Sequence, residues 1–184
     1  MPCASKDGAL DVAVNNAGTL GSFAPLLEQT EQDLDDVLDL NLKSVWWAVR
    51  TQARAMIQLD RPGVVVNVSS WLSTGALAGS SAYSASKAGV DGLMRAAALE
   101  LAPHGVRINN VNPGGIDTEM TRAAFDAQGM DDFGAAHPVG RIGTPDEVAA
   151  LIVFLSSDAA SFLHGQAVAV DGGYGIPGQR PVAT

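Results

Sequence analysis

A tyrosine and a lysine stand four residues apart, Tyr83 and Lys87, inside the segment SAYSASKAG. On a helix this spacing places both side chains on one face. A free phenol has a pKa of about 10 and is a poor base near neutral pH. A cation at about 4 Å, with an effective dielectric constant of about 20, stabilises the phenolate by about 4 kcal/mol, enough to lower its pKa by as much as about three. The pair therefore predicts a phenol that works as a general acid or base, with a half-buried tyrosine beside a solvated lysine as the alternative.

A second hydroxyl group is expected beside this pair. Ser70 ends an apolar segment of the chain and precedes Tyr83. Ligands of open parallel sheets bind at the carboxyl ends of the strands, so the Ser70 hydroxyl is placed to hydrogen-bond a substrate oxygen. An ordinary turn serine is the alternative. The neighbouring Trp71 either lines the substrate pocket or packs in a core or an interface.

Alternating apolar and helix-length segments must position these groups. Strands are predicted over residues 10–18, 63–70, 106–114 and 165–173. Helices are predicted over residues 31–57, 82–101 and 145–158, with Thr30 and Thr144 as N-caps. Strands separated by helices indicate a parallel α/β sheet with right-handed crossovers. The pattern weakens over residues 117–137, which predicts a mobile excursion or lid.

Composition limits the partners of the chain. Its 184 residues, read as one domain over 1–184, carry a formal net charge of −9, which argues against nucleic acid and against an anionic membrane surface. The single cysteine, Cys3, allows no internal disulfide, no signal-peptide pattern is present, and no apolar run reaches the length of a membrane span. We therefore expect a cytoplasmic protein. No metal site is predicted, because His104 and His137 lack the spacing of ligands and are interpreted as surface or lid residues.

Five short motifs carry a resemblance to a known family. They are NNAG (15–18), NVSS (67–70), YSASK (83–87), NPGGIDTEM (112–120) and VDGGY (170–174). Their order and spacing resemble the classical short-chain dehydrogenase/reductase family over nearly the whole chain. The resemblance implies hydride transfer between NAD or NADP and a carbonyl or secondary-alcohol substrate. It also implies a homodimer or homotetramer that pairs through the long helices.

The resemblance assigns roles to residues of this sequence. Tyr83 would be the general acid/base, Ser70 would hold the substrate oxygen, and Lys87 would lower the tyrosine pKa and bind the nicotinamide ribose. Asn41 would position a water molecule in the proton relay, and a helix kink is its structural alternative. The further cofactor-binding residues implied, besides Tyr83 and Lys87, are Asn15, Ala17 and Gly18 on the adenine-side ribose and Pro113, Gly114, Ile116 and Thr118 near the nicotinamide.

The glycine-rich phosphate-binding turn of the family is absent from this sequence, and the first predicted strand matches the family's fourth. We therefore expect a partial Rossmann-type doubly wound parallel sheet with helices on both faces, which corresponds to the C-terminal portion of the family fold. The favoured explanation is a longer native chain. A truncated product and a fragment completed by a second chain are the alternatives. The residues that choose between NAD and NADP are not in this sequence.

Two other functions are weighed against the oxidoreductase. One is a non-catalytic fragment that acts as an oligomerisation or interaction module. The other is a serine hydrolase, which is disfavoured because the sequence has no G-x-S-x-G elbow and no histidine in a triad context.

Overall fold

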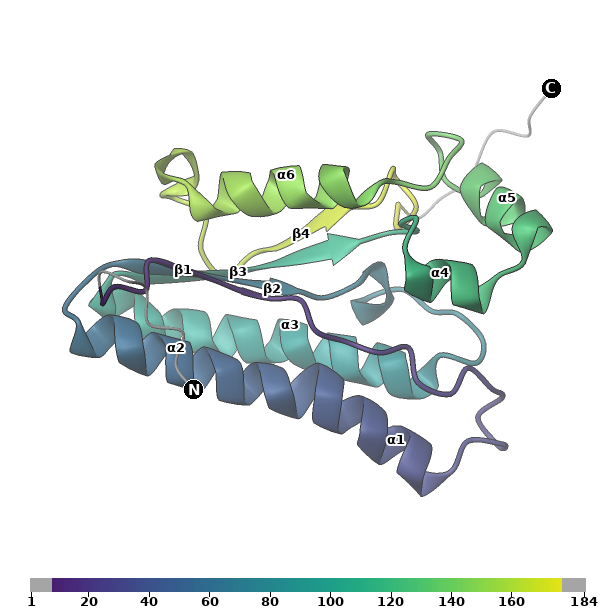
Figure 1. Ribbon diagram of the computed structural model, residues 1–184, viewed down its shortest axis with the longest axis horizontal. Coiled ribbons are helices and arrows are strands. Elements are labelled where there is room, and N and C mark those ends of the chain that lie inside the picture. The colour runs from purple at the N-terminus through teal and green to yellow at the C-terminus, as the bar shows by residue number, and fades with distance from the viewer. Residues whose placement is uncertain (1–7, 177–184) are drawn as a thin grey trace.

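The computed structural model describes residues 8–176 and contains a four-stranded parallel sheet with helices on both faces (Figure 1). The strands lie in sequence order and are β1 (Val12–Asn15), β2 (Gly63–Val68), β3 (Val106–Pro113) and β4 (Ala167–Val170). All three strand pairs are parallel. The predicted fold class is confirmed, and each of the four predicted strands overlaps an observed strand.

The helices of one face form a long layer under the sheet. They are α1 (Glu31–Leu38), a π-helical stretch (Asp39–Lys43), α2 (Ser44–Gln58) and α3 (Ser81–Leu101). The predicted cap at Thr30 is confirmed as a capping box with Asp33. Asn41 lies inside the π-helical stretch, an irregularity of the kind at which helices kink, and the helix kink considered for Asn41 stays a prediction.

The opposite face is covered by α6 (Pro145–Ser156), which begins with a capping box between Thr144 and Glu147. The segment over residues 117–137, where the sequence pattern weakens, has regular structure, and its role as a mobile excursion or lid stays a prediction. Two short helices form there, α4 (Glu119–Ala124) and α5 (Ala127–Ala135). Thr118 and Asp126 cap them by accepting backbone N–H bonds from Thr121 and Gly129, a local signal that helical periodicity does not contain. The described part of the chain also contains three short 3₁₀ helices, Trp71–Ser73, Ala102–His104 and Asp158–Ala160.

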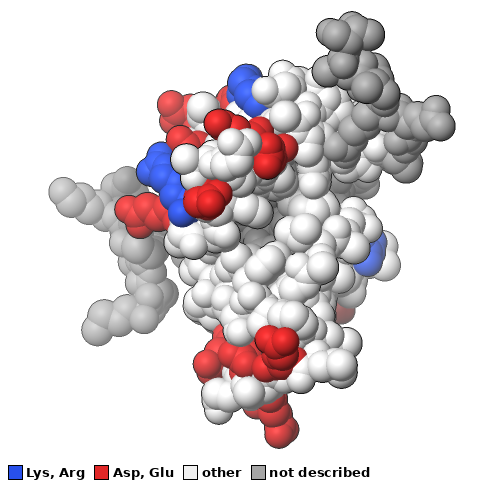
Figure 2. Space-filling view, turned by 90° about the vertical axis from the view of Figure 1, so that its right-hand side faces the viewer, with Lys and Arg blue, Asp and Glu red and all other residues white. Residues whose placement is uncertain are grey.

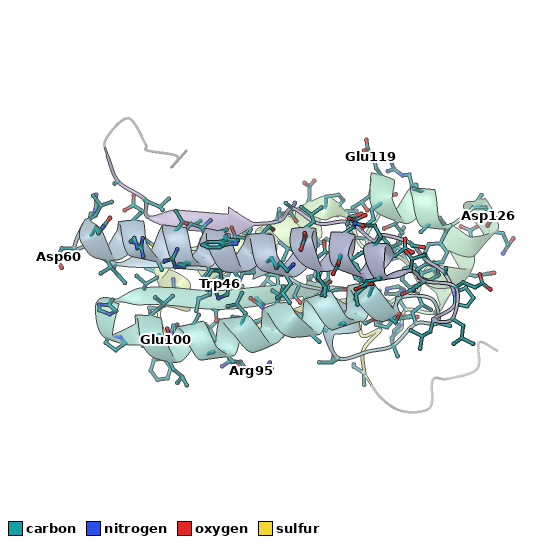
Figure 3. The ribbon with its side chains drawn as sticks, turned by 90° about the horizontal axis from the view of Figure 1, so that it is seen from below. Trp46, Asp60, Arg95, Glu100, Glu119 and Asp126 are labelled. Atoms are coloured by element: carbon teal, nitrogen blue, oxygen red, sulfur yellow. The ribbon has the colours of Figure 1, made fainter. Side chains whose placement is uncertain are left out.

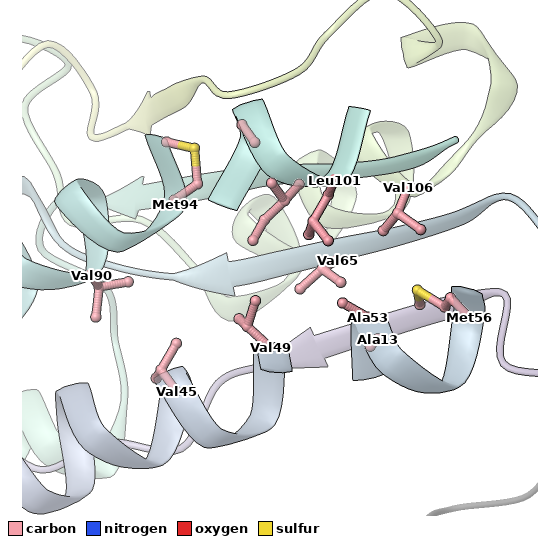
Figure 4. Close-up of a cluster of buried hydrophobic side chains, with 12 residues drawn as sticks. Ala13, Val45, Val49, Ala53, Met56, Val65, Val90, Met94, Leu101 and Val106 are labelled. Atoms are coloured by element: carbon pink, nitrogen blue, oxygen red, sulfur yellow. The ribbon is translucent and has the colours of Figure 1, made fainter. Parts of the chain in front are cut away.

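Two hydrophobic clusters hold the layers together, one on each face of the sheet. The cluster against α2 and α3, drawn in Figure 4, contains Val49, Met56, Val65, Val90 and Met94. The cluster under α6 contains Val64, Val66, Val111 and Leu155. Val65 and its neighbours in β2 belong to opposite clusters because successive side chains of a strand point to opposite faces. β2 and β3 are buried on both faces, which explains why these two strands show little polar alternation.

Within residues 8–176, no helix combines the length and the apolar character that a membrane crossing requires. β1 lies at one edge of the described sheet. Its Val12 and Val14 are 42% and 45% exposed, although β1 has the apolar composition of a covered strand.

Candidate active site

A cavity of about 460 Å³ lies at the carboxyl ends of β1, β2 and β3, between the start of α3 and the helices α4 and α5. Figure 2 looks onto this end of the molecule, and the surface is hollowed near the centre of the view. Parallel strands place their carboxyl ends at the same edge of the sheet, so the loops that follow them meet in one place. The cavity therefore lies at the edge of the sheet where the sequence predicts the Ser70 hydroxyl and its substrate.

Most of the predicted site residues line this cavity. They are Ala17, Gly18, Ser70, Tyr83, Lys87, Pro113, Gly114, Ile116 and Thr118. Asn15 and Asn41 are not among the lining residues, and each is held by hydrogen bonds next to the cavity.

The Ser70 hydroxyl is oriented by the chain turn that follows β2. Ser70 is the N-cap of the 3₁₀ helix Trp71–Ser73, and its Oγ accepts a hydrogen bond from the backbone N–H of Leu72 at 3.1 Å. Because Oγ accepts this bond, its O–H proton is left for another acceptor. That arrangement suits a hydroxyl that donates to a carbonyl oxygen inside the cavity.

Lys87 is buried, with 4% of its surface exposed, and its environment is unusual for an ammonium group. Its Nζ donates to the carbonyl of Val68 at the end of β2, at 3.0 Å, and lies 5.5 Å from the centroid of the Tyr83 ring. Burial lowers the pKa of Lys87 to about 8, and the charge of Asp91 acts in the opposite direction.

The Tyr83 phenol differs from the expectation. Burial raises its pKa above the ordinary value, and a hydrogen bond with the Ser70 side chain offsets part of that rise. The Lys87 ammonium lies over the ring of Tyr83. Sequence spacing predicts that the two residues are neighbours, but it contains no information on how deeply the pair is buried.

Lys87 gives the protein a testable pH dependence. Folding lowers the Lys87 pKa from 10.5 to about 8, so the unfolded chain binds this proton more tightly. The contribution of Lys87 to the free energy of unfolding therefore rises between pH 8 and 10.5 and is least favourable below pH 8. Relative to wild type, Lys87→Met is expected to be most stable below pH 8 and to lose that relative advantage as the pH rises toward 10.

Thermal unfolding followed by circular dichroism between pH 7 and 10 measures this difference in melting temperature. Lys43→Met is the matched control, because Lys43 is an exposed lysine paired with Asp39, and its difference from wild type should stay flat over that range. A flat difference for Lys87→Met as well would contradict the burial argument.

Asn41 fixes the loop that follows β1. Its side-chain Oδ1 accepts from the N–H of Thr19 at 2.8 Å, and its Nδ2 donates to the Thr19 carbonyl at 2.8 Å and to Ser86 Oγ at 3.1 Å. A Cβ on Gly18 would lie 3.3 Å from Asn41 Oδ1 and 3.6 Å from Lys87 Nζ. Gly18 therefore keeps open the space between Asn41 and Lys87, and the water-positioning role of Asn41 stays a prediction.

A ladder of buried amides crosses the sheet behind the cavity, and sequence reasoning missed it. Asn15 donates to Asn67 at 2.8 Å, Asn67 donates to Asn110 at 2.9 Å, and Asn110 donates to Asp91 of α3 at 2.7 Å. Asp91 also accepts from Asn112, at 3.0 Å. The signal was present, since asparagine stands near the end of three of the predicted strands. The ladder holds the carboxyl ends of three strands in register beneath the cavity.

His137 was also interpreted incorrectly as a surface or lid residue, because it is buried. Its Nε2 accepts from the N–H of Gly115 at 3.0 Å, and its Nδ1 lies 2.7 Å from the carbonyl of Phe133. A Cβ on Gly115 would approach both Phe133 and His137 closely. His137 thus joins α5 to the loop after β3, which contains three of the predicted cofactor-binding residues, Gly114, Ile116 and Thr118.

Residues 3–175 match the protein family described as Enoyl-(Acyl carrier protein) reductase. The chain belongs to the short-chain dehydrogenase/reductase family. It is 43% identical over 171 residues to the cis-4-hydroxycyclohexanecarboxylate dehydrogenase of Sinomonas cyclohexanicum, covering 93% of this chain and 68% of that protein. It is 41% identical over 168 residues to the 3-oxoacyl-(acyl-carrier-protein) reductase FabG of Thermotoga maritima, covering 91% of this chain and 67% of that protein.

The solved structure of ElxO with NADP bound has the same fold as this short-chain dehydrogenase/reductase. The TM-score is 0.85 at 33% identity, covering 92% of this chain and 68% of that chain. The chain thus spans about two thirds of the length of these relatives. Family membership confirms the predicted class, an oxidoreductase dependent on NAD or NADP.

Proposed function

We propose that this short-chain dehydrogenase/reductase transfers a hydride between NAD or NADP and a carbonyl or secondary-alcohol substrate, with Tyr83 as the general acid/base. The observation that supports it most strongly is the convergence of three groups in one largely apolar cavity. The Ser70 hydroxyl comes from the end of β2, and the Tyr83 phenol and Lys87 ammonium come from one face of α3.

The cavity fits the nicotinamide end of the cofactor. Among residues 8–176, the Lys87 ammonium makes a hydrogen bond only to Val68, so its two other protons are available to ribose hydroxyls. Gly18 leaves open the space beside that ammonium. The residues that would hold the cofactor are Lys87, Gly18 and the loop Pro113–Thr118, with Ala17 beside Gly18. When bound, the nicotinamide supplies or accepts the hydride.

The protein's own residues handle the proton. In the reducing direction, Ser70 donates a hydrogen bond to the carbonyl oxygen and Tyr83 gives that oxygen its proton. In the oxidising direction, the phenolate of Tyr83 takes the proton back. Because burial raises the Tyr83 pKa, the phenol is protonated at neutral pH. This state suits reduction, and oxidation is expected to become faster as the pH rises.

Cofactor binding tests the proposal directly. NADH and NADPH are expected to quench the fluorescence of Trp71, which lines the cavity, in a saturable way. Reduced nicotinamide mononucleotide, which lacks the adenosine half, should compete for the same site. In the matched variant Trp71→Phe the quenching should be lost while calorimetry still detects binding. No binding of any of the three molecules would contradict the proposed function.

The non-catalytic alternative retains one supporting observation. Trp46 and Trp47 of α2 are both exposed, pack edge-to-face on each other and lie beside Arg50. Figure 3 views this layer from below and shows Trp46 on the α2 side. Both side chains are about half exposed, so neither is buried against the sheet.

An exposed tryptophan pair is expected to mark a contact surface. We infer a homodimer or homotetramer through the α2 and α3 layer, in a cytoplasmic protein. Light scattering should give a mass of at least twice 18.9 kDa. An oligomer that binds no nicotinamide would favour the non-catalytic alternative.

A further inference from the structure

We propose that the substrate is a neutral, mainly apolar ketone or secondary alcohol, such as a single-ring compound, and that thioesters on an anionic carrier are excluded. This inference rests on the proposed function of the same cavity. The two relatives named above act on chemically different substrates at similar identity, so identity does not decide the question. The walls and the rim of the cavity indicate which substrate class fits.

The walls are apolar and aromatic. Loops and helices on all sides contribute Phe23, Trp71, Leu77, Met120, Phe125 and Phe133. Among the lining residues, the ionisable side chains are Tyr83 and Lys87, both assigned to proton and cofactor chemistry. A substrate group that faces these walls gains free energy by being apolar and loses it by being charged.

Few polar groups are left for a substrate with many hydroxyls. The Ser69 hydroxyl donates to the carbonyl of Lys87 at 3.1 Å, and the Thr121 hydroxyl donates to the carbonyl of Ile116 at 2.6 Å. Their donor protons are therefore already bonded within the protein. Ser70 and Tyr83 match a single carbonyl or alcohol oxygen. Asn16 also lines the cavity with a side-chain amide that makes no hydrogen bond within residues 8–176, so a sugar alcohol would still leave most of its hydroxyls unpaired.

The aromatic side chains that line the cavity are supported by contacts with other aromatic rings. The Trp71 ring contacts Tyr174 edge-on with centroids 4.7 Å apart, and Phe133 contacts Tyr174 at 5.4 Å. Phe125 stacks on Phe133 at 5.2 Å. These contacts hold the aromatic side chains on one side of the cavity in fixed orientations, which favours a rigid ring over a flexible chain.

The rim carries negative charge. Glu119 begins α4 and Asp126 caps α5, the two helices whose other residues line the cavity. The basic residue of α4, Arg122, is paired with Asp117 at 2.7 Å. Figure 2 shows carboxylate groups above and below the hollow, with few basic residues between them. A phosphorylated carrier arm would have to approach this rim against repulsion, with no unpaired cation of α4 to receive it.

A substrate panel tests the inference. With NADPH or NADH, kcat/KM for cyclohexanone and acetophenone is expected to exceed that for acetoacetyl-coenzyme A by at least about 100-fold, and oxidation of cyclohexanol to exceed that of xylitol similarly, from the cost of leaving charged or polar groups unpaired. Preference for the thioester or for the sugar alcohol would overturn the inference.

Two charge-reversal variants test whether the negative charge of the rim lowers kcat/KM for acetoacetyl-coenzyme A. Glu119→Lys is expected to raise kcat/KM for acetoacetyl-coenzyme A several-fold at low salt, to lose that gain at high salt, and to leave cyclohexanone unchanged. Glu100→Lys makes the same charge change at the far end of the molecule, where Figure 3 labels it, and should have no effect. Equal behaviour of the two variants would contradict a role for the rim.

A binding measurement separates this inference from the proposed function. Saturation-transfer NMR with acetophenone and with coenzyme A reports occupancy without turnover. Binding of acetophenone and not coenzyme A, with no turnover of any substrate, would support the cavity's preference and contradict the proposed function. Failure of acetophenone to bind would overturn the inference itself.

Discussion

Replacing Tyr83 by phenylalanine is expected to lower kcat by about 10³-fold while the fold and cofactor affinity stay unchanged, since a positioned general acid or base contributes about 10²–10⁴-fold. Phenylalanine keeps the ring that lies against Lys87 and removes only the hydroxyl. The effect should fall on kcat, because the proton moves in the transition state and the ring continues to fill its place in the cavity. Steady-state rates measured from reduced nicotinamide absorbance give the result.

The chain supplies a matched control, since it has only two tyrosines. Tyr174→Phe removes the other phenolic hydroxyl and keeps the ring that supports Trp71, so kcat is expected to stay within a few-fold of wild type. Ser70→Ala removes the hydroxyl proposed to hold the substrate oxygen and should lower kcat less than Tyr83→Phe does. Near-normal kcat in Tyr83→Phe, with an unchanged circular-dichroism spectrum, would rule out the proton-transfer role.

The reactive groups were predictable from sequence for a geometric reason. Tyr83 and Lys87 share a helix face by spacing, and Ser70 lies at the carboxyl end of a strand, so a parallel sheet must bring the three together. The strand positions follow from apolar runs, and the starts of two helices follow from Thr30 and Thr144. These signals depend on residues that are close in sequence, so the structures they predict are also found in the folded chain.

Three features could not be predicted because they depend on depth and on side-chain orientation. The direction of the Tyr83 pKa is set by burial, which spacing does not reveal. The burial of His137 depends on a bond to Gly115 from a distant part of the chain. The pairing of Asp91 with asparagines of β3 requires α3 to lie across that strand, and no periodic pattern encodes which polar residues of a helix face inward.

Asp91→Ala is expected to lower the free energy of unfolding by about 2–6 kcal/mol, because two buried amide N–H groups each lose an acceptor at a cost of about 1–3 kcal/mol. Asp91 is buried and accepts hydrogen bonds from Asn110 at 2.7 Å and from Asn112 at 3.0 Å. Alanine leaves one N–H of each amide without its acceptor, in a layer where water is excluded. Urea unfolding followed by circular dichroism measures the change, with an unchanged m-value as the check on two-state behaviour.

Two control variants test whether the loss of stability comes from the hydrogen bonds of Asp91 or from removing any carboxylate of α3. Glu100→Ala removes an exposed carboxylate of the same helix and should change the free energy of unfolding by less than about 0.5 kcal/mol. Asp91→Asn keeps one acceptor oxygen and should fall between Asp91→Ala and wild type. Asp91 also raises the pKa of Lys87, so both variants should lower that pKa further below about 8. A loss in Asp91→Ala no larger than that in Glu100→Ala would mean that the amide ladder does not depend on its carboxylate. The strand ends beneath the cavity would then be held in place by packing alone.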